Sequence, residues 1–133
     1  MSRSAIYTAN TTPTSVAVGG LIPLGNTIRR FGCNVVQDGN TITIKGRGYF
    51  KVVASFTVAP AIAGIVSASL SKDGVAVIGG TASGSVSTAA NPTDLTIAAI
   101  VRNDCDCDSS ILSFNLGGTA STLLNAAVTV EKL

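Results

Sequence analysis

The chain has 133 residues, of which 46% are hydrophobic but only 12% charged and 5% aromatic, and its formal net charge is +2. This length suits one domain with a single hydrophobic core. Because the sequence contains no histidine, it cannot form a Ser-His-Asp or Cys-His catalytic site, and it lacks the commonest zinc ligand.

The basic residues are dispersed along the chain, and Arg29 and Arg30 form the one adjacent pair. Nucleic-acid binders concentrate basic residues on one face with aromatic side chains between them, so we expect no nucleic-acid partner. The sequence has no run of 18 apolar residues and no apolar core of a signal peptide near Met1. We therefore expect no membrane partner, and folding in the cytoplasm where the chain is made.

Residues 9–26 (ANTTPTSVAVGGLIPLGN) are rich in Thr and punctuated by Pro, and they enclose two short apolar patches. Two interpretations stay open for residues 1–26. They form edge strands ahead of the main domain, or they form an arm that docks on a neighbouring subunit or a capsid and is ordered by binding. The main domain is then residues 27–133.

The hydrophobic pattern of residues 27–133 predicts strands and no amphipathic helix. In residues 41–46 (TITIKG) Ile42 and Ile44 alternate with polar residues, as in a half-buried strand. Asp73 and Gly74 lie between two alternating runs and predict a hairpin turn, since both tolerate positive φ. Short strands at this spacing favour a β-sandwich or jelly roll. Further strands are predicted at 48–58 (GYFKVVASFTV, with Phe50, Val52, Ala54 and Phe56 on one face), 65–80 (IVSASLSKDGVAVIGG), 93–102 (TDLTIAAIVR), 111–116 (ILSFNL) and 126–133 (AAVTVEKL).

Three segments together resemble a known family: 32–58 (GCNVVQDGNTITIKGRGYFKVVASFTV), 65–77 (IVSASLSKDGVAV) and 125–133 (NAAVTVEKL). They are similar to successive strands of the trimeric jelly-roll superfamily of tumour necrosis factor and the globular head of the first complement component. Within it they resemble the bacterial and phage branch, which includes heads of spore-surface collagen-like glycoproteins. The resemblance covers about residues 27–133 and is patchy between 80 and 110. The residues that carry it are Asn34, Gly39, Gly48, Tyr49, Phe50, Lys72, Asp73 and Gly74.

This resemblance implies an all-β, antiparallel jelly-roll sandwich of about ten strands that assembles as a homotrimer and serves binding or display rather than catalysis. Small residues in two predicted strands, such as Ala98 and Ala127, either face large residues across the sandwich or let a strand pack closely against another subunit. With the resemblance, they lead us to expect an apolar threefold interface from these strands. The candidate interface residues are Ile97, Ala99, Val101, Ala127 and Thr129.

The stretch from Asp104 to Asp108 (DCDCD) holds three of the seven acidic residues and two of the three cysteines. Four interpretations stay open for this predicted loop. Zinc could use Cys105 and Cys107 with Cys33 or an aspartate, although the Cys-x-Cys spacing is unusual. Calcium could use Asp104, Asp106 and Asp108, although the usual central Gly and distant Glu are missing. Alternatively the loop is solvated with inert thiols, or a disulfide joins Cys33 to Cys105 or Cys107. We expect no metal or cofactor.

The sequence shows no collagen-like stalk, membrane anchor or export signal. We therefore expect a non-enzymatic, homotrimeric phage virion surface protein, which could be a capsid decoration, a head fibre or a tail component. Its partners are itself and other virion proteins, and it is assembled in the host cytoplasm. The alternative is an adhesin or glycan-binding head on a bacterial cell or spore surface, with a surface glycan as partner. That role often exposes aromatic rings for stacking on sugars, and the chain has only two Tyr, four Phe and no Trp.

Overall fold

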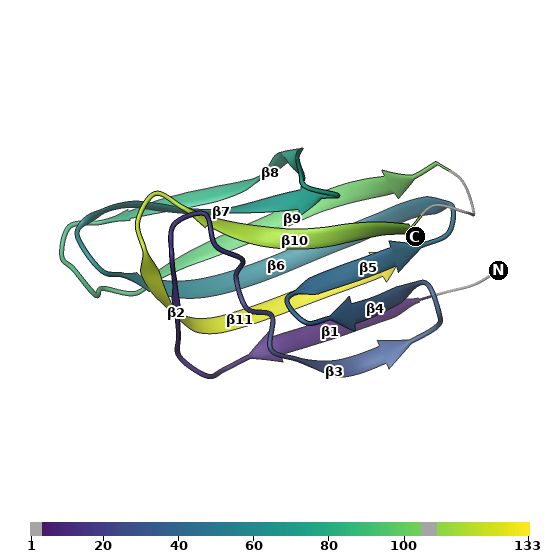
Figure 1. Cartoon of the computed structure of the whole chain (residues 1–133), viewed down its shortest axis with the longest axis horizontal. Coiled ribbons are helices and arrows are strands. Elements are labelled where there is room, and N and C mark those ends of the chain that lie inside the picture. Colours follow the sequence, from purple (N-terminus) through teal and green to yellow (C-terminus); the bar gives the residue numbers. More distant parts are fainter. Residues whose placement is uncertain (1–3, 105–108) are drawn as a thin grey trace.

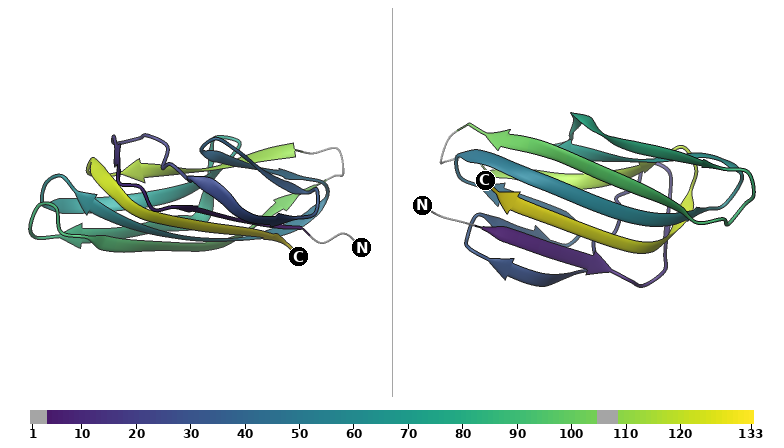
Figure 2. Two further views of the ribbon diagram at one scale, coloured as in Figure 1. Left: turned by 90° about the horizontal axis from the view of Figure 1, so that it is seen from below. Right: turned by 180° about the vertical axis from the view of Figure 1, so that it is seen from behind.

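A computed structural model describes residues 4–104 and 109–133 of the chain. These residues form eleven strands and no helix, in two antiparallel sheets that pack face to face (Figure 1 and Figure 2). The predicted all-β jelly roll is confirmed, and no helix of the described residues is long and apolar enough to cross a membrane. The strands are β1 (Ala5–Asn10), β2 (Thr14–Val16), β3 (Asn26–Phe31), β4 (Val35–Asp38), β5 (Thr41–Lys45), β6 (Gly48–Pro60), β7 (Gly64–Lys72), β8 (Val75–Val86), β9 (Thr93–Asn103), β10 (Ser109–Gly117) and β11 (Ser121–Lys132).

In both sheets the order of the strands differs from their order along the chain. The six-stranded sheet runs β3-β1-β11-β6-β9, with β2 also paired to β11, and the five-stranded sheet runs β4-β5-β10-β7-β8. Strands that are neighbours in sequence, such as β9 and β10, therefore lie in opposite sheets. At one edge of the sandwich β8 and β9 lie side by side, one from each sheet (Figure 1).

The core fills the space between the sheets with alternate residues of each strand. In β6 the predicted inward residues Phe50, Val52, Ala54 and Phe56 are all fully buried, and Ile42 and Ile44 of β5 are buried as well. The Phe56 ring meets Phe114 of β10 edge-on, with centroids 5.1 Å apart and planes at 66°. Because these rings come from opposite sheets, this contact joins the two layers, and aromatic pairs prefer such edge-on geometry.

The predicted Asp73-Gly74 turn joins β7 to β8. Both residues have positive φ, 52° and 83°, and Lys72 pairs with Val75 across the turn. This is the geometry that a two-residue hairpin turn requires. The Asp73 carboxylate also accepts a hydrogen bond from the backbone N–H of Ile111 at 2.8 Å, so the turn is tied to β10 as well.

The N-terminal segment is built into both sheets. In the six-stranded sheet β1 is an interior strand between β3 and β11, and β2 pairs with β11. In the five-stranded sheet the backbone N–H of Ile22 donates to the carbonyl of Phe114, 2.8 Å away. Ile22 and Leu24 have no exposed surface. Residues 4–26 thus supply both strand pairing and core side chains.

Thr8, on β1, is fully buried, and its hydroxyl makes no hydrogen bond to the described residues. A buried hydroxyl without a partner keeps its desolvation cost, and valine has nearly the same shape. We predict that Thr8→Val raises the free energy of unfolding by about 1 kcal/mol, as measured by urea denaturation. Thr81→Val, on the exposed side of the five-stranded sheet, is the matched control and should change it little. A loss of stability in Thr8→Val alone would contradict this assignment.

Candidate functional site

The candidate site is the face of the six-stranded sheet that points away from the core, here called the outer face. Strand pairing arranges its side chains in rows that cross five strands, since paired residues point to the same side. The rows follow from the pairings of β3 with β1, β1 with β11, β11 with β6 and β6 with β9. The first row is Phe31, Ala5, Glu131, Lys51 and Ile100, and the second is Arg29, Tyr7, Thr129, Val53 and Ala98.

The outer face is flat in the middle and has bulky apolar side chains near both edges. Phe31 on β3 is 57% exposed, and Ile100 on β9 is 60% exposed. The second row combines the small Thr129 and Ala98 with larger side chains, and the third row consists of small residues: Asn26, Ala9, Ala127, Ser55 and Thr96. Lys51 and Glu131 are paired on neighbouring strands in the first row, so their charges offset each other. The charges at the centre of the face are therefore balanced, and its most exposed apolar side chains lie near the edges.

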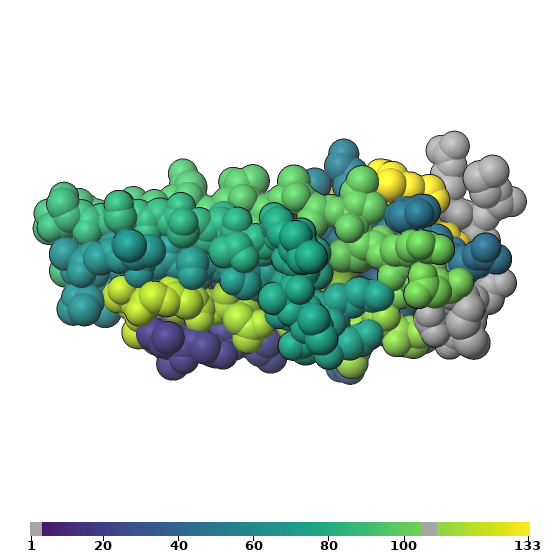
Figure 3. Space-filling view, turned by 90° about the horizontal axis from the view of Figure 1, so that it is seen from above, coloured from purple at the N-terminus to yellow at the C-terminus, as the bar shows by residue number. Residues whose placement is uncertain are grey.

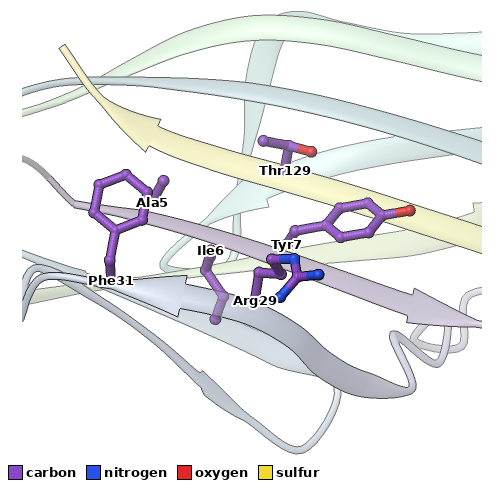
Figure 4. Close-up of a pocket in the computed structure, with 6 residues that line it drawn as sticks. All are labelled: Ala5, Ile6, Tyr7, Arg29, Phe31 and Thr129. Atoms are coloured by element: carbon purple, nitrogen blue, oxygen red, sulfur yellow. The ribbon is translucent and has the colours of Figure 1, made fainter.

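Shallow hollows along this face connect into one continuous surface. One is lined by Lys51, Val53, Thr129 and Glu131, and a second by Lys51, Ala98, Ala99 and Ile100. A third, called the β1–β3 hollow below, is lined by Ala5, Ile6, Tyr7, Arg29, Phe31 and Thr129. Figure 4 shows the rings of Phe31 and Tyr7 at its two ends, with Ile6 between them. The shared residues Lys51 and Thr129 link the three hollows.

Polar interactions lie at the two ends of the outer face. At one end the Arg102 guanidinium lies over the Tyr49 ring, 5.6 Å from its centroid, and also contacts the Asp104 carboxylate at 3.2 Å. At the other end the Thr57 hydroxyl donates to the Asp94 carboxylate at 2.8 Å. These polar groups border the part of the face that carries the apolar side chains, and protein interfaces commonly have a polar rim.

The exposed side of the five-stranded sheet is different in character. Apart from Ile65 and Ile111, near its two ends, this side carries mainly hydroxyl and amide side chains along its central strands. Ser69 illustrates the pattern, since it pairs with Asn115 on one side and Thr81 on the other. Hydroxyl groups are readily solvated by water, so this sheet needs no covering partner. The outward-facing residues are Ser67, Ser69, Ser71, Thr81, Ser83, Ser85, Ser113 and Asn115.

The structure separates the predicted interface residues into two groups. Ala127 and Thr129 lie on the outer face, whereas Ile97 and Val101 point into the core with exposed fractions of 2% and 5%. Ala99 also packs against the core. On β9 the outward residues are instead Ala98 and Ile100, one position along from those predicted. The sequence of β9 is apolar on both faces, and only its pairing with β6, where Ala98 meets Val53, shows which face is outward.

The acidic Cys-rich stretch is described only in part. Cys105, Asp106, Cys107 and Asp108 lie outside the described residues, so neither the calcium nor the zinc interpretation is tested. Within the described parts of the chain, no three His, Cys, Asp or Glu residues are grouped to hold a metal ion. Cys33 is an exposed free thiol between β3 and β4. The neighbouring Asn34 side chain donates to the carbonyl of Lys45, which pairs with Ser109, so Cys33 lies at the end of the sandwich where β10 begins.

No protein-family model matches the sequence, and no curated protein matches it significantly. Solved structures do match the fold. Eiger TNF from S. frugiperda superposes with a TM-score of 0.73 at 11% identity, covering 99% of this chain and 92% of that one. The globular domain of zebrafish complement 1qA protein gives 0.71 at 10% identity, with coverages of 97% and 95%. The chain has the jelly-roll fold of these two heads. PRD1 vertex protein P5 shares this fold too, with a TM-score of 0.66 at 15% identity and coverages of 98% and 96%.

The exposed position of Cys33 yields a prediction about the thiols. Cys33 packs against no part of the core, and surface substitutions of this kind change stability by less than about 0.5 kcal/mol. We predict that Cys33→Ser folds normally, as judged by circular dichroism and urea denaturation. Intact mass with and without thiol alkylation should show at most one disulfide within a chain, because three thiols leave one unpaired. A Cys33→Ser variant that fails to fold would contradict this prediction.

Proposed function

We propose that this chain is a non-enzymatic surface protein of a phage particle, assembled in the host cytoplasm as a homotrimer and mounted on the capsid or tail for structural or display binding. The observation that carries the proposal is the outer face, on which the large apolar side chains Tyr7, Phe31 and Ile100 are exposed in a single chain. Contiguous exposed apolar surface of this kind marks interaction sites in soluble proteins. The jelly-roll resemblance supports a second and third copy of the chain as its cover.

A homotrimer accounts for the contrast between the two exposed sheet surfaces. The outer face combines small residues such as Ala98 and Ala127 with bulky ones such as Ile100, so neighbouring subunits can approach closely and still bury apolar area. Interfaces of obligate oligomers are large and resemble a protein core, with about 2,000 Å² or more buried. The hydroxyl-rich surface of the five-stranded sheet then remains in contact with water.

Placement on a phage particle is supported by the likeness to a virion component. PRD1 vertex protein P5 has the same fold over nearly the whole of both chains. A trimer also suits a particle surface with threefold or quasi-threefold positions, because each of three weak contacts adds avidity to the next. Capsid decoration, head fibre and tail component all meet this description.

The alternative function is an adhesin or glycan-binding head on a bacterial cell or spore surface. Glycan binding through stacking needs exposed aromatic rings. Three of the six aromatic residues, Phe50, Phe56 and Phe114, are fully buried, and the exposed three, Tyr7, Phe31 and Tyr49, all lie on the outer face. A trimer that covers this face leaves no aromatic ring for sugars elsewhere, so we favour the virion role.

Assembly through the outer face is tested by a charge at its centre. Val53 lies in the second row of the face, between Thr129 and Ala98. We predict that the wild-type chain sediments as a trimer at micromolar concentration, and that Val53→Asp shifts it to monomer because three buried carboxylates would lack partners. Ser113→Asp, on the exposed side of the five-stranded sheet, is the matched control and should stay trimeric. A wild-type chain that sediments only as a monomer would refute the assembly.

The virion role is tested by where the protein is found. We expect mass spectrometry of purified particles, from the phage whose genome carries the gene, to detect this chain in stoichiometric amounts. Washed cells and spores of the host are the control sample. Absence from particles, together with presence on cell or spore surfaces, would replace the virion role by the adhesin.

A further inference from the structure

Strand β8 carries an insertion that breaks its pairing with β7. Ser69 pairs with Thr81 and Ser71 pairs with Ala76, so Leu70 alone faces the four residues 77–80, called the spur below. Gly79 has a φ of 81°, which allows the backbone to turn back toward the sheet. The spur projects from the edge of the sandwich beside β9 (Figure 1), and Figure 3 looks onto this edge, with β8 in teal.

The tip of the spur is an isoleucine. Ile78 is 100% exposed, and Val75, just before the spur, is 71% exposed. A bulge by itself protects an edge strand against unwanted pairing, and this protection does not require an exposed apolar side chain at its tip. A fully exposed Ile contributes nothing to the stability of its own chain. Its apolar surface is therefore available to a partner.

The β1–β3 hollow offers an apolar cavity at the opposite edge of the same molecule. It is bordered by the exposed rings of Tyr7 and Phe31 and by Ala5, Arg29 and Thr129, whereas the Ile6 side chain beneath it is part of the core. Ala5, which is paired with Phe31, leaves room beside that ring (Figure 4). The hollow thus presents apolar side chains in a concave arrangement, at a site that the chain does not fill with its own residues among those described.

The spur and the hollow lie at the same level along the strands. The Lys72 ammonium, before the spur, donates to the carbonyl of Arg102 at 2.7 Å. After the spur, a Cβ at Gly84 would lie 2.9 Å from the Thr93 hydroxyl. The spur therefore lies beside the intervening part of β9, residues 94–101, whose middle is near Ala98. The strand pairings place Ala98 at the same height along the strands as Tyr7 and Arg29. They place Ile100 at the same height as Ala5 and Phe31.

This arrangement is what a closed ring of three copies requires. In a cyclic trimer each subunit contributes two different patches, one to each neighbour, and rotation about the axis involves no shift along it. A knob and a hollow on opposite edges, at equal height along the strands, meet this condition. Two patches at different heights would generate an open helix instead.

We infer that the Ile78 spur of one copy inserts into the β1–β3 hollow of the next, and so completes a site that one chain leaves open. The inference rests on the proposed homotrimer and specifies which residues meet within it. Ile78 then lies between the Tyr7 and Phe31 rings of its neighbour, above Ala5. All three contacts are apolar.

Disulfide trapping tests the contact directly. Cys33, Cys105 and Cys107 are first changed to Ser, and circular dichroism and sedimentation confirm fold and assembly. The double variant Ile78→Cys, Ala5→Cys is then oxidised and run on non-reducing gels. Covalent dimers and closed trimers are expected. Each single variant should remain a monomer on the gel, because in a head-to-tail ring neither residue meets its own copy.

A matched control replaces Ile78 by another exposed isoleucine. Ile62 is 64% exposed in the turn between β6 and β7, where Ala61 bonds to Ala120 at the far end of the sandwich. The pair Ile62→Cys, Ala5→Cys should not cross-link. In the wild-type background, Ile78→Asp should weaken trimer association at least tenfold, whereas Ile62→Asp should leave it unchanged.

The outcomes separate this inference from the proposed function. A chain that sediments as a trimer but gives no cross-link through Ile78, and in which Ile78→Asp has no effect, disproves the insertion and leaves the homotrimer standing. Cross-linking of Ile78→Cys to itself would show a two-fold contact and also overturn the insertion. A chain that is monomeric throughout overturns both. If the cysteine-free chain does not fold, the Ile78→Asp and Ile62→Asp comparison decides alone.

Discussion

Burial of alternate strand residues between the two sheets is the constraint on which the other features of this molecule depend. Its centre is the edge-on contact between Phe56 and Phe114, one ring from each sheet. Once Phe56 points inward, the period of two along β6 turns Val53 and Ser55 outward. A shift of one residue would expose the core side chains of the whole strand. The inward face and the outer face are therefore determined by the same register, and neither can change alone.

The two sheets make different use of their exposed sides. Along the five-stranded sheet the outward positions are mostly Ser, Thr and Asn, which water solvates readily. Along the six-stranded sheet the same positions include Ala, Val, Ile and aromatic rings, with Lys51 and Glu131 as a neutral pair and a few hydroxyl side chains among them. A protein that needed only to remain soluble would have no reason for this difference. The asymmetry is the physical basis for assigning assembly to one sheet and solvent contact to the other.

The N-terminal segment enlarges the outer face. Without β1 and β3 the six-stranded sheet would end at β11, and the β1–β3 hollow would not exist. The same segment buries Ile22 and Leu24 and pairs with strands of both sheets. Residues 4–31 therefore stabilise the single chain and also supply the part of the outer face that the spur of a neighbour can reach.

The sequence by itself determined the strand type, the inward faces of β5 and β6 and the turn at Asp73-Gly74, because alternation and turn residues are local properties. Three features were decided only by the tertiary structure. The outward face of β9 depends on pairing with β6, since Ile97, Ala98, Ala99 and Ile100 are apolar on both sides. The interior place of β1 depends on pairing with β11, more than a hundred residues away in the chain. In the sequence the spur looks like part of an ordinary strand. Only the pairing with β7 shows that residues 77–80 lie opposite the single residue Leu70, because an insertion is defined by the strand beside it.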